Sequence, residues 1–151
     1  LLNIRLDCIE KLFNHLEKND CSLVYGDVVQ VEEENQNFEQ HRDSNNIFEH
    51  SKYEFSHENM IKCLPGPMPL WYKNVHNQCG FFDDKEMWLR MVSRGHKFKK
   101  LNEKVGLYLI GGRSQQEDIE QRKEESKLFF KYSNIFGNNY QKYYPYFKQF
   151  I

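Results

Sequence analysis

Segments with a helical pattern of apolar residues alternate with segments that have a strand pattern. Apolar residues in 3–18 recur at the i, i+3, i+4 spacing, which predicts an amphipathic helix. They are Leu6, Ile9, Leu12, Phe13 and Leu16. Residues 22–31 are rich in β-branched and aromatic side chains and predict a buried strand. A helix followed directly by a buried strand indicates an α/β fold, a sheet flanked by helices.

The middle of the chain is polar and then rich in proline. Residues 32–58 hold eight acidic and two basic side chains, and we predict a solvated excursion folded as an irregular hairpin. Ser56 is expected to cap a short helix that ends near Cys63. The segment L-P-G-P-M-P-L-W-Y-K at 64–73 contains three prolines in five residues. Proline excludes helix and central strand, so we expect a rigid turn that becomes extended from Met68 onward.

The second half of the chain predicts further helices and strands. A short helix is expected at 74–78 and a longer one at 85–94, where Gly95 provides a C-terminal stop. Residues 98–101 and 105–110 are predicted to form a β-hairpin around 102–104.

The C-terminal residues are predicted to form a helical extension. Ser114 and Glu117 have the S-x-x-E spacing of a capping box, so a helix should begin at Ser114 and run to about Phe136. The aromatic tail 140–151 is expected to pack back on the domain. We therefore expect one domain over 1–151, with 1–113 as its α/β part and 114–151 as the extension.

Composition excludes several classes of protein. The chain of 151 residues is long enough for one core, and its net charge of −1 provides no general attraction for nucleic acid. No apolar run is long enough to span a membrane. The first ten residues lack a basic region followed by a long apolar one, so we expect no signal peptide and a cytoplasmic location. The four cysteines lack the clustered spacing of a zinc site and are expected to be reduced, and we assign no metal ligand.

Glycine and nucleophile motifs of several common enzymes are missing. The sequence contains no G-x-G-x-x-G, no P-loop, no G-x-S-x-G and no H-E-x-x-H. An acid at the start of the helix 85–94, Asp84, would be held ionised by the free backbone amides there. Such a carboxylate can serve as a general base, or it can simply cap the helix.

Four segments in order carry a resemblance to a known family. They are V-Y-G-D at 24–27, L-P-G-P-M-P-L-W at 64–71, G-F-F-D-D-K-E-M-W-L-R-M-V-S-R-G-H-K-F at 80–98 and V-G-L-Y-L at 105–109. This order resembles the C-terminal, acceptor-side half of GT-A fold family 2 glycosyltransferases, over roughly residues 3–115. The most specific match is D-K-E-M-W-L-R at 84–90. The resemblance implies a partial GT-A-like mixed sheet flanked by helices.

The resemblance also implies an activity and a set of site residues. A nucleotide-diphosphate sugar would donate its sugar, with inversion, to a hydroxyl of a glycan, lipid or protein acceptor. Asp84 aligns with the family's general base, and Asp83 is the alternative. The resemblance places Gly66, Met68, Trp71 and His76 on the acceptor side, and Asp27, Arg113 and Ser114 on the donor side. It further implies Mn²⁺ or Mg²⁺ held by an Asp-x-Asp motif, which this sequence lacks.

Two alternatives belong to other functional classes. The chain can be a non-catalytic glycan- or protein-binding module on a truncated glycosyltransferase scaffold, with Asp84 only a helix cap and the acidic excursion 32–58 contacting a partner. It can also be an α/β domain whose aromatic tail 140–151 mediates oligomerisation. Trp71 has its own alternative, as a core residue instead of a sugar-stacking platform.

Overall fold

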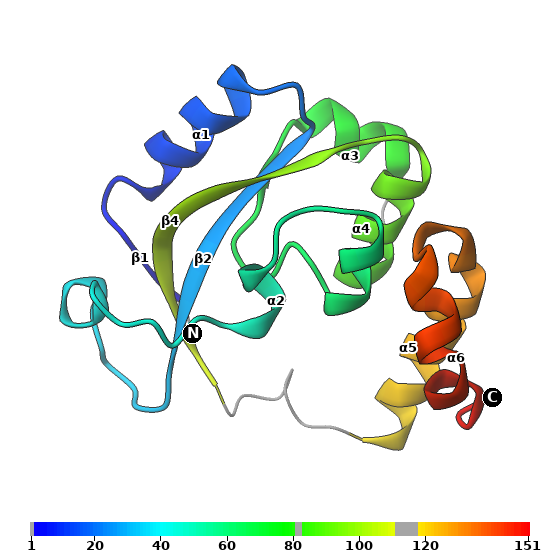
Figure 1. Ribbon diagram of the computed structural model, residues 1–151. Helices are drawn as coiled ribbons and strands as arrows, with labels where there is room; N and C mark the ends of the chain where they lie inside the picture. The colour runs from blue at the N-terminus through cyan, green and yellow to red at the C-terminus, as the bar shows by residue number, and fades with distance from the viewer. Residues whose placement is uncertain (1, 81–82, 111–117) are drawn as a thin grey trace.

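A mixed β-sheet forms the centre of the domain in the computed structural model, which describes residues 2–80, 83–110 and 118–151 (Figure 1). Within these residues the sheet has four strands, in the spatial order β1-β4-β2-β3. They are β1 (Leu2–Ile4), β2 (Leu23–Val31), β3 (Leu70–Trp71) and β4 (Phe98–Leu109). β2 and β4 run parallel, whereas β1 and β3 are antiparallel to β4 and β2. The predicted α/β class is confirmed.

β4 is one continuous strand, so the hairpin predicted around residues 102–104 is wrong. Gly26 pairs with Leu101 and the next residue, Asp27, pairs with Lys104, so two residues of β4 bulge out of the ladder. A side chain at position 26 would bring its Cβ within 2.6 Å of Val105 Cγ1, and only glycine permits this close approach. The polar stretch that resembles a turn therefore forms a bulge, because β2 continues alongside β4 on both sides of it.

Helices cover the two faces of the sheet (Figure 1). α1 packs on one face, and α2 and α4 lie on the other, with α5 and α6 beyond α4. The helices are α1 (Cys8–Lys18), α2 (Glu49–Lys52), α3 (Lys73–Cys79), α4 (Asp84–Ser93), α5 (Ile119–Lys131) and α6 (Asn138–Lys148). Short 3₁₀ turns occur at η1 (Phe38–His41), η2 (Glu58–Lys62) and η4 (Ser133–Ile135). The helices predicted at 74–78 and 85–94 are confirmed.

α1 begins later than predicted and buries a narrower stripe. Residues 2–4 form β1 instead of helix, and the buried face of α1 consists of Cys8, Leu12 and Leu16. Three residues of the predicted apolar stripe, Leu6, Ile9 and Phe13, are exposed. The spacing of Cys8, Leu12 and Leu16 is i, i+4, i+8, which is the single row of a helix that contacts the sheet.

The acidic excursion returns along β2 as an irregular hairpin, as predicted, but its last part is buried. Ile47 forms an isolated antiparallel bridge with Val29, and the backbone N–H of Phe48 donates to Val28 O at 2.7 Å. The side chain of Ser51 is fully buried and accepts the N–H of Val28 at 3.1 Å. Ser56 Oγ accepts the N–H of Asn59 at 3.0 Å, but the N-cap residue of the following 3₁₀ turn is His57.

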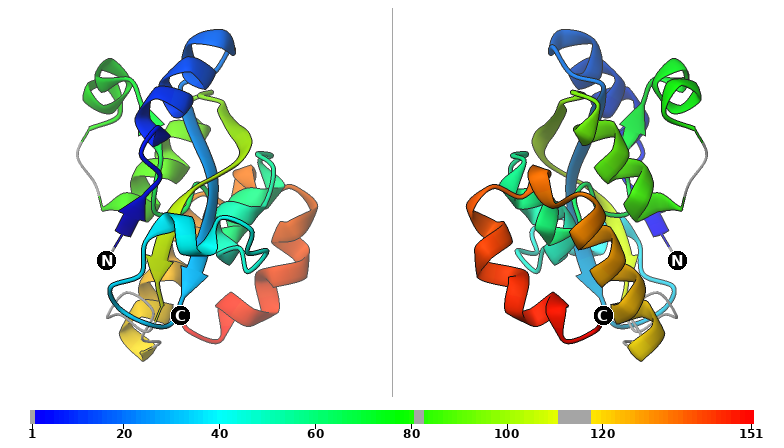
Figure 2. Two further views of the ribbon diagram at one scale, coloured as in Figure 1. Left: turned by 90° about the vertical axis from the view of Figure 1, so that its left-hand side faces the viewer. Right: turned by 90° about the vertical axis from the view of Figure 1, so that its right-hand side faces the viewer.

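The C-terminal extension is a pair of helices packed against α4. α5 begins at Ile119 because Asp118 is extended and its carboxylate accepts the N–H of Gln121 at 2.7 Å. The helix ends at Lys131, not at Phe136, and the predicted capping box of Ser114 and Glu117 lies outside the described residues. Figure 2 shows α5 and α6 against one another, at the opposite end of the molecule from α1.

The aromatic tail packs back on the domain, as predicted. Its anchor is Phe129 of α5, which is fully buried and stacks on rings of the residues that follow it. The ring centroids lie 5.3 Å away for Phe136, 5.1 Å for Tyr140 and 4.4 Å for Phe147. Phe136 belongs to the core cluster of α4 and β2, and Tyr140 and Phe147 are partly buried against that cluster, so the tail covers one side of the main hydrophobic core.

Phe129→Ala should lower the free energy of unfolding by about 3–5 kcal/mol, because it removes the ring on which the tail stacks. Phe13→Ala is the matched control, since Phe13 is exposed and its loss should cost within about 0.5 kcal/mol. Urea unfolding followed by circular dichroism measures both. Equal losses for the two variants would show that the tail is not docked on Phe129.

Candidate functional site

A cavity of about 420 Å³ lies beside the first turn of α4, and we name it the Asp84 cavity. Its walls come from the end of the acidic excursion, the proline-rich turn, α4, β4 and the C-terminal helices. The lining residues are Phe48, His50, Cys63, Gly66, Pro67, Asp84, Lys85, Trp88, Tyr108, Gln121, Arg122, Glu125 and Tyr146. Polar groups from segments far apart in the sequence therefore converge on one space, which is the usual character of a small-molecule site.

The two neighbouring acids of α4 have different roles. Asp83 is the N-cap, and its carboxylate accepts the backbone N–H of Glu86 at 3.3 Å. Asp84 is the first helical residue, is exposed, and lines the cavity, while one of its oxygens accepts the N–H of Lys85 at 2.8 Å. The geometry thus distinguishes the two candidates for the general base, since Asp84 lines the cavity and Asp83 caps the N-terminus of α4.

α4 is a rigid support for Asp84. Five of its ten residues are buried, including Trp88 and Met91, so the helix cannot shift without exposing apolar surface. Its C-terminus is closed by Gly95 at φ 91°, with the N–H of His96 donating to Met91 O at 3.1 Å. The backbone of Asp84 is consequently held at a fixed place on the cavity wall.

Gly66 forms a wall of the cavity because it permits a close approach of two backbones. Its φ is +83°, and a Cβ there would lie 3.0 Å from both His50 O and Ser51 Cβ. A larger residue would be strained and would push the proline-rich turn away from α2. The turn and the end of the excursion therefore meet at Gly66.

Ion pairs fix α5 next to α4 at the cavity. Lys85 pairs with Glu125 across the cavity wall, and Gln121 Nε2 donates to the same carboxylate at 3.4 Å. The next residue of α4, Glu86, accepts hydrogen bonds at Oε1 from Lys131 Nζ at 2.5 Å and from Tyr132 OH at 3.0 Å. The hydrogen bond from Lys131 is the main reason that the pKa of Glu86 is lowered.

Two further cavity groups are uncharged at neutral pH. Burial lowers the pKa of His50, and the nearby cation of Lys85 lowers it further. Burial also raises the pKa of the Cys63 thiol. His50 can therefore donate or accept a hydrogen bond as a neutral imidazole, and Cys63 is a thiol and not a thiolate nucleophile.

Three residues predicted for the acceptor side lie away from the cavity lining. Met68 is buried and contacts Gly106, where an added Cβ would come within 2.7 Å of its Sδ, so Met68 is a core residue. Trp71 stacks on His76 with a centroid distance of 6.1 Å and meets Trp88 edge to face at 5.1 Å. Trp71 and His76 thus support Trp88, which does line the cavity.

Asp27, predicted for the donor side, lines a different pocket. Its carboxylate pairs with the buried ammonium of Lys100 at 2.8 Å, and Lys100 Nζ also donates to Lys52 O at 2.8 Å. This pocket of about 240 Å³ shares no lining residue with the Asp84 cavity among the described residues. Arg113 and Ser114, the other donor-side predictions, lie outside the described residues.

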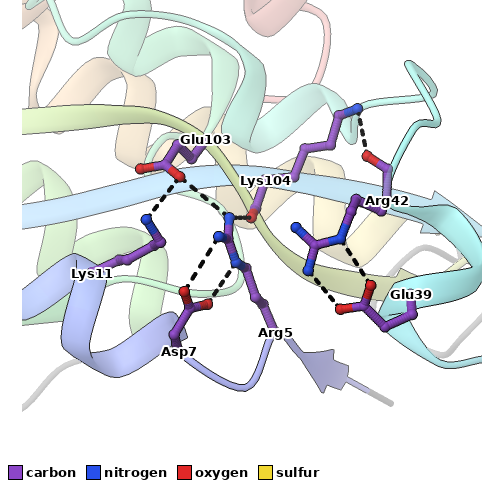
Figure 3. A network of polar contacts seen from close by, with 7 residues as sticks. All are labelled: Arg5, Asp7, Lys11, Glu39, Arg42, Glu103 and Lys104. Atoms are coloured by element: carbon purple, nitrogen blue, oxygen red, sulfur yellow. Dashed lines mark hydrogen bonds and ion pairs between the residues drawn. The ribbon is translucent and has the colours of Figure 1, made fainter.

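The Asp27 pocket is bordered by a network of ion pairs that joins three segments (Figure 3). Arg5 pairs with Asp7 at 2.6 Å and with Glu103 at 3.3 Å. The Arg42 guanidinium donates two hydrogen bonds to the carboxylate of Glu39, and Lys104 Nζ donates to Arg42 O at 2.9 Å. The network ties the N-terminal segment and the acidic excursion to the bulge of β4, so its role is structural.

Several cavity residues were missing from the sequence prediction. They are His50, Lys85, Trp88, Tyr108, Gln121, Arg122 and Glu125. No local motif marks His50, Gln121, Arg122 or Glu125, because each reaches the cavity through the packing of an element from elsewhere in the chain. The partial signals were Lys85 and Trp88 in D-K-E-M-W-L-R and Tyr108 in V-G-L-Y-L, since they belong to segments that the resemblance included.

The described residues do not account for the metal ion that the resemblance implies. Among residues 2–80, 83–110 and 118–151, no group of three or more His, Cys, Asp or Glu side chains is placed to hold a metal. In the same part of the chain, no helix is both long and apolar enough to cross a membrane.

Comparison with protein-family models and with curated proteins returned no match.

Lys85→Met should raise the pKa of His50, because it removes a nearby cation and leaves the carboxylate of Glu125 without its partner. Lys127→Met is the control, since Lys127 pairs with Glu124 on the exposed side of α5 at 2.9 Å. A titration of the His50 ring by NMR measures the pKa. An unchanged value in Lys85→Met would contradict the arrangement of charges in the cavity.

The stability of the chain should fall as the pH decreases below about 6.5. The folded pKa of His50 is lower than its ordinary value of 6.5, so the unfolded chain binds more protons just below that pH. His50→Gln should reduce this loss of stability, whereas His57→Gln should not, because His57 is exposed. Urea unfolding at about pH 7.5 and about pH 5.5 tests this, and identical pH dependence in all three chains would disprove it.

Proposed function

We propose that the Asp84 cavity is the acceptor-side site of an inverting glycosyltransferase of the GT-A, family 2 type. The observation that carries this proposal is that Gly66 and Asp84, which come from two separate motifs of the resemblance, line one cavity. The mixed α/β sheet is compatible with such a scaffold. The donor would be a nucleotide-diphosphate sugar, and the acceptor group would be a hydroxyl.

The proposed chemistry uses Asp84 as the general base. The acceptor oxygen attacks the anomeric carbon of the donor sugar while the bond from that carbon to the diphosphate breaks, which inverts the configuration. The carboxylate of Asp84 takes the proton that the hydroxyl loses. Because α4 is anchored by its buried face, the backbone that carries Asp84 is already in position before the acceptor binds.

Other groups of the cavity can bind and orient the acceptor. The neutral imidazole of His50, the amide of Gln121 and the phenol of Tyr108 all line it and can hydrogen-bond sugar hydroxyls. Trp88 and Tyr146 provide aromatic surface on the same wall. The lining thus combines hydrogen-bonding groups with apolar and aromatic surface, and a carbohydrate offers both hydroxyls and apolar ring faces to such a site.

A non-catalytic glycan-binding module is the second candidate. It is favoured by the lack of an Asp-x-Asp motif in the sequence and by the lack of a three-ligand metal group among the described residues. In that case the same cavity would bind the glycan and Asp84 would only accept hydrogen bonds from it.

Asp84→Asn should reduce sugar transfer by about 10²–10⁴-fold, because an amide cannot take the proton. Asp83→Asn is the matched control, since asparagine caps a helix as well as aspartate does and transfer should persist. Both variants should keep the free energy of unfolding within about 1 kcal/mol of the wild type. Product formation from a panel of nucleotide-diphosphate sugars and glycan acceptors, measured by mass spectrometry with Mn²⁺ or Mg²⁺ added, provides the readout.

Transfer that survives at the wild-type rate in Asp84→Asn would exclude Asp84 as the base. Glycan binding to the Asp84 cavity without transfer from any donor would favour the binding module instead.

A further inference from the structure

A second, apolar pocket adjoins the Asp84 cavity. It has a volume of about 100 Å³ and lies between η2, α4 and the C-terminal helices. Most of its lining is hydrocarbon or aromatic, from Met60, Ile61, Leu64, Leu89, Leu128 and Phe129. Its remaining walls are Phe136 and Phe147 of the aromatic tail and the residues that it shares with the cavity. A space with this lining favours apolar groups over water.

The two spaces have a common wall. Cys63, Lys85, Trp88 and Glu125 line both of them. The ion pair between Lys85 and Glu125 therefore stands at the junction, with a polar space that contains Asp84 on one side and an apolar space on the other. A ligand that enters from the cavity would meet the charged groups first and hydrocarbon beyond them.

Backbone strain is also located at this junction. Cys63 has φ +62°, a left-handed conformation that a residue with a Cβ rarely adopts. The surrounding structure must hold it there, and such strain is found preferentially at binding and catalytic sites. Cys63 lines both the apolar pocket and the Asp84 cavity, so the residue between them has an unfavourable backbone conformation.

We propose that the apolar pocket binds an alkyl group of the acceptor, attached to the hydroxyl that reaches the Asp84 cavity. This assignment rests on the proposed function of Asp84. An engineered apolar cavity of about 150 Å³ binds benzene, so a pocket of 100 Å³ has room for a chain of about four carbons. The acceptor class is therefore an amphipathic molecule with a hydroxylated head and a short or terminal alkyl portion.

The first test is an NMR titration of the chain with 1-butanol, which has four carbons and one hydroxyl. We expect saturable shifts in the methyl groups of Met60, Leu64 and Leu89. 1,4-Butanediol is the matched probe, because its second hydroxyl would enter hydrocarbon without a hydrogen-bond partner. It should bind at least about tenfold more weakly than 1-butanol.

Leu128→Phe should fill the pocket and weaken 1-butanol binding at least about tenfold, because it occupies the space that the ligand needs. Leu6→Phe makes the same change at a fully exposed position and should leave binding unchanged. In a transfer assay, Leu128→Phe should raise the KM for a butyl glycoside acceptor more than the KM for a methyl glycoside acceptor. The substitution should not lower kcat for either acceptor.

The proposal is overturned if the lining methyl groups show no saturable shift, if the diol binds as well as the alcohol, or if Leu6→Phe weakens binding as much as Leu128→Phe. The comparison of the two probes uses the wild-type chain, so it decides the matter even if Leu128→Phe does not fold. Normal 1-butanol binding with no transfer from any donor would disprove the proposed function alone. Transfer without 1-butanol binding would disprove the alkyl subsite alone.

Discussion

The parallel pairing of β2 with β4 is the interaction on which the rest of the structure depends. Their ladder runs from Leu23 beside Phe98 to Val31 beside Leu109, and both strands are buried over much of their length. Because parallel strands need a crossover connection, the whole segment between them must fold against the sheet. That crossover contains α2, the proline-rich turn, α3 and α4, so the pairing gathers most walls of the Asp84 cavity on one face.

The C-terminal helices complete the site. α5 is attached to α4 by ion pairs between Lys85 and Glu125 and between Glu86 and Lys131. Phe129 of α5 stacks on Phe147 of α6 and shares one core cluster with the buried residues of α4. Ion pairs of this kind contribute little free energy when exposed, and the buried rings contribute more. The rings therefore supply most of the stability of the docked helices, and the charges set the register of α5, which decides that Gln121 and Arg122 face the cavity.

The position of Asp84 shows how a one-residue difference changes the chemistry available to a side chain. Asp83 uses its carboxylate to close the first turn of α4, whereas Asp84 is free of that task and faces the cavity. What separates them is direction, because successive helical residues point about 100° apart.

Sequence patterns alone determined the local elements and one part of the site. The periodicity of α4, the stop at Gly95 and the strand β2 follow from side-chain spacing and backbone preference, which are local properties. Gly66 and Asp84 were named from motifs, and Asp84 stays a proposal as a base. The tertiary structure decided the continuity of β4 through its bulge, the burial of Cys8 instead of Leu6 on α1, and the placing of Met68 in the core. It also decided that His50, Lys85 and Glu125 meet, because contacts between distant segments depend on the packing of whole elements and leave no pattern in either segment.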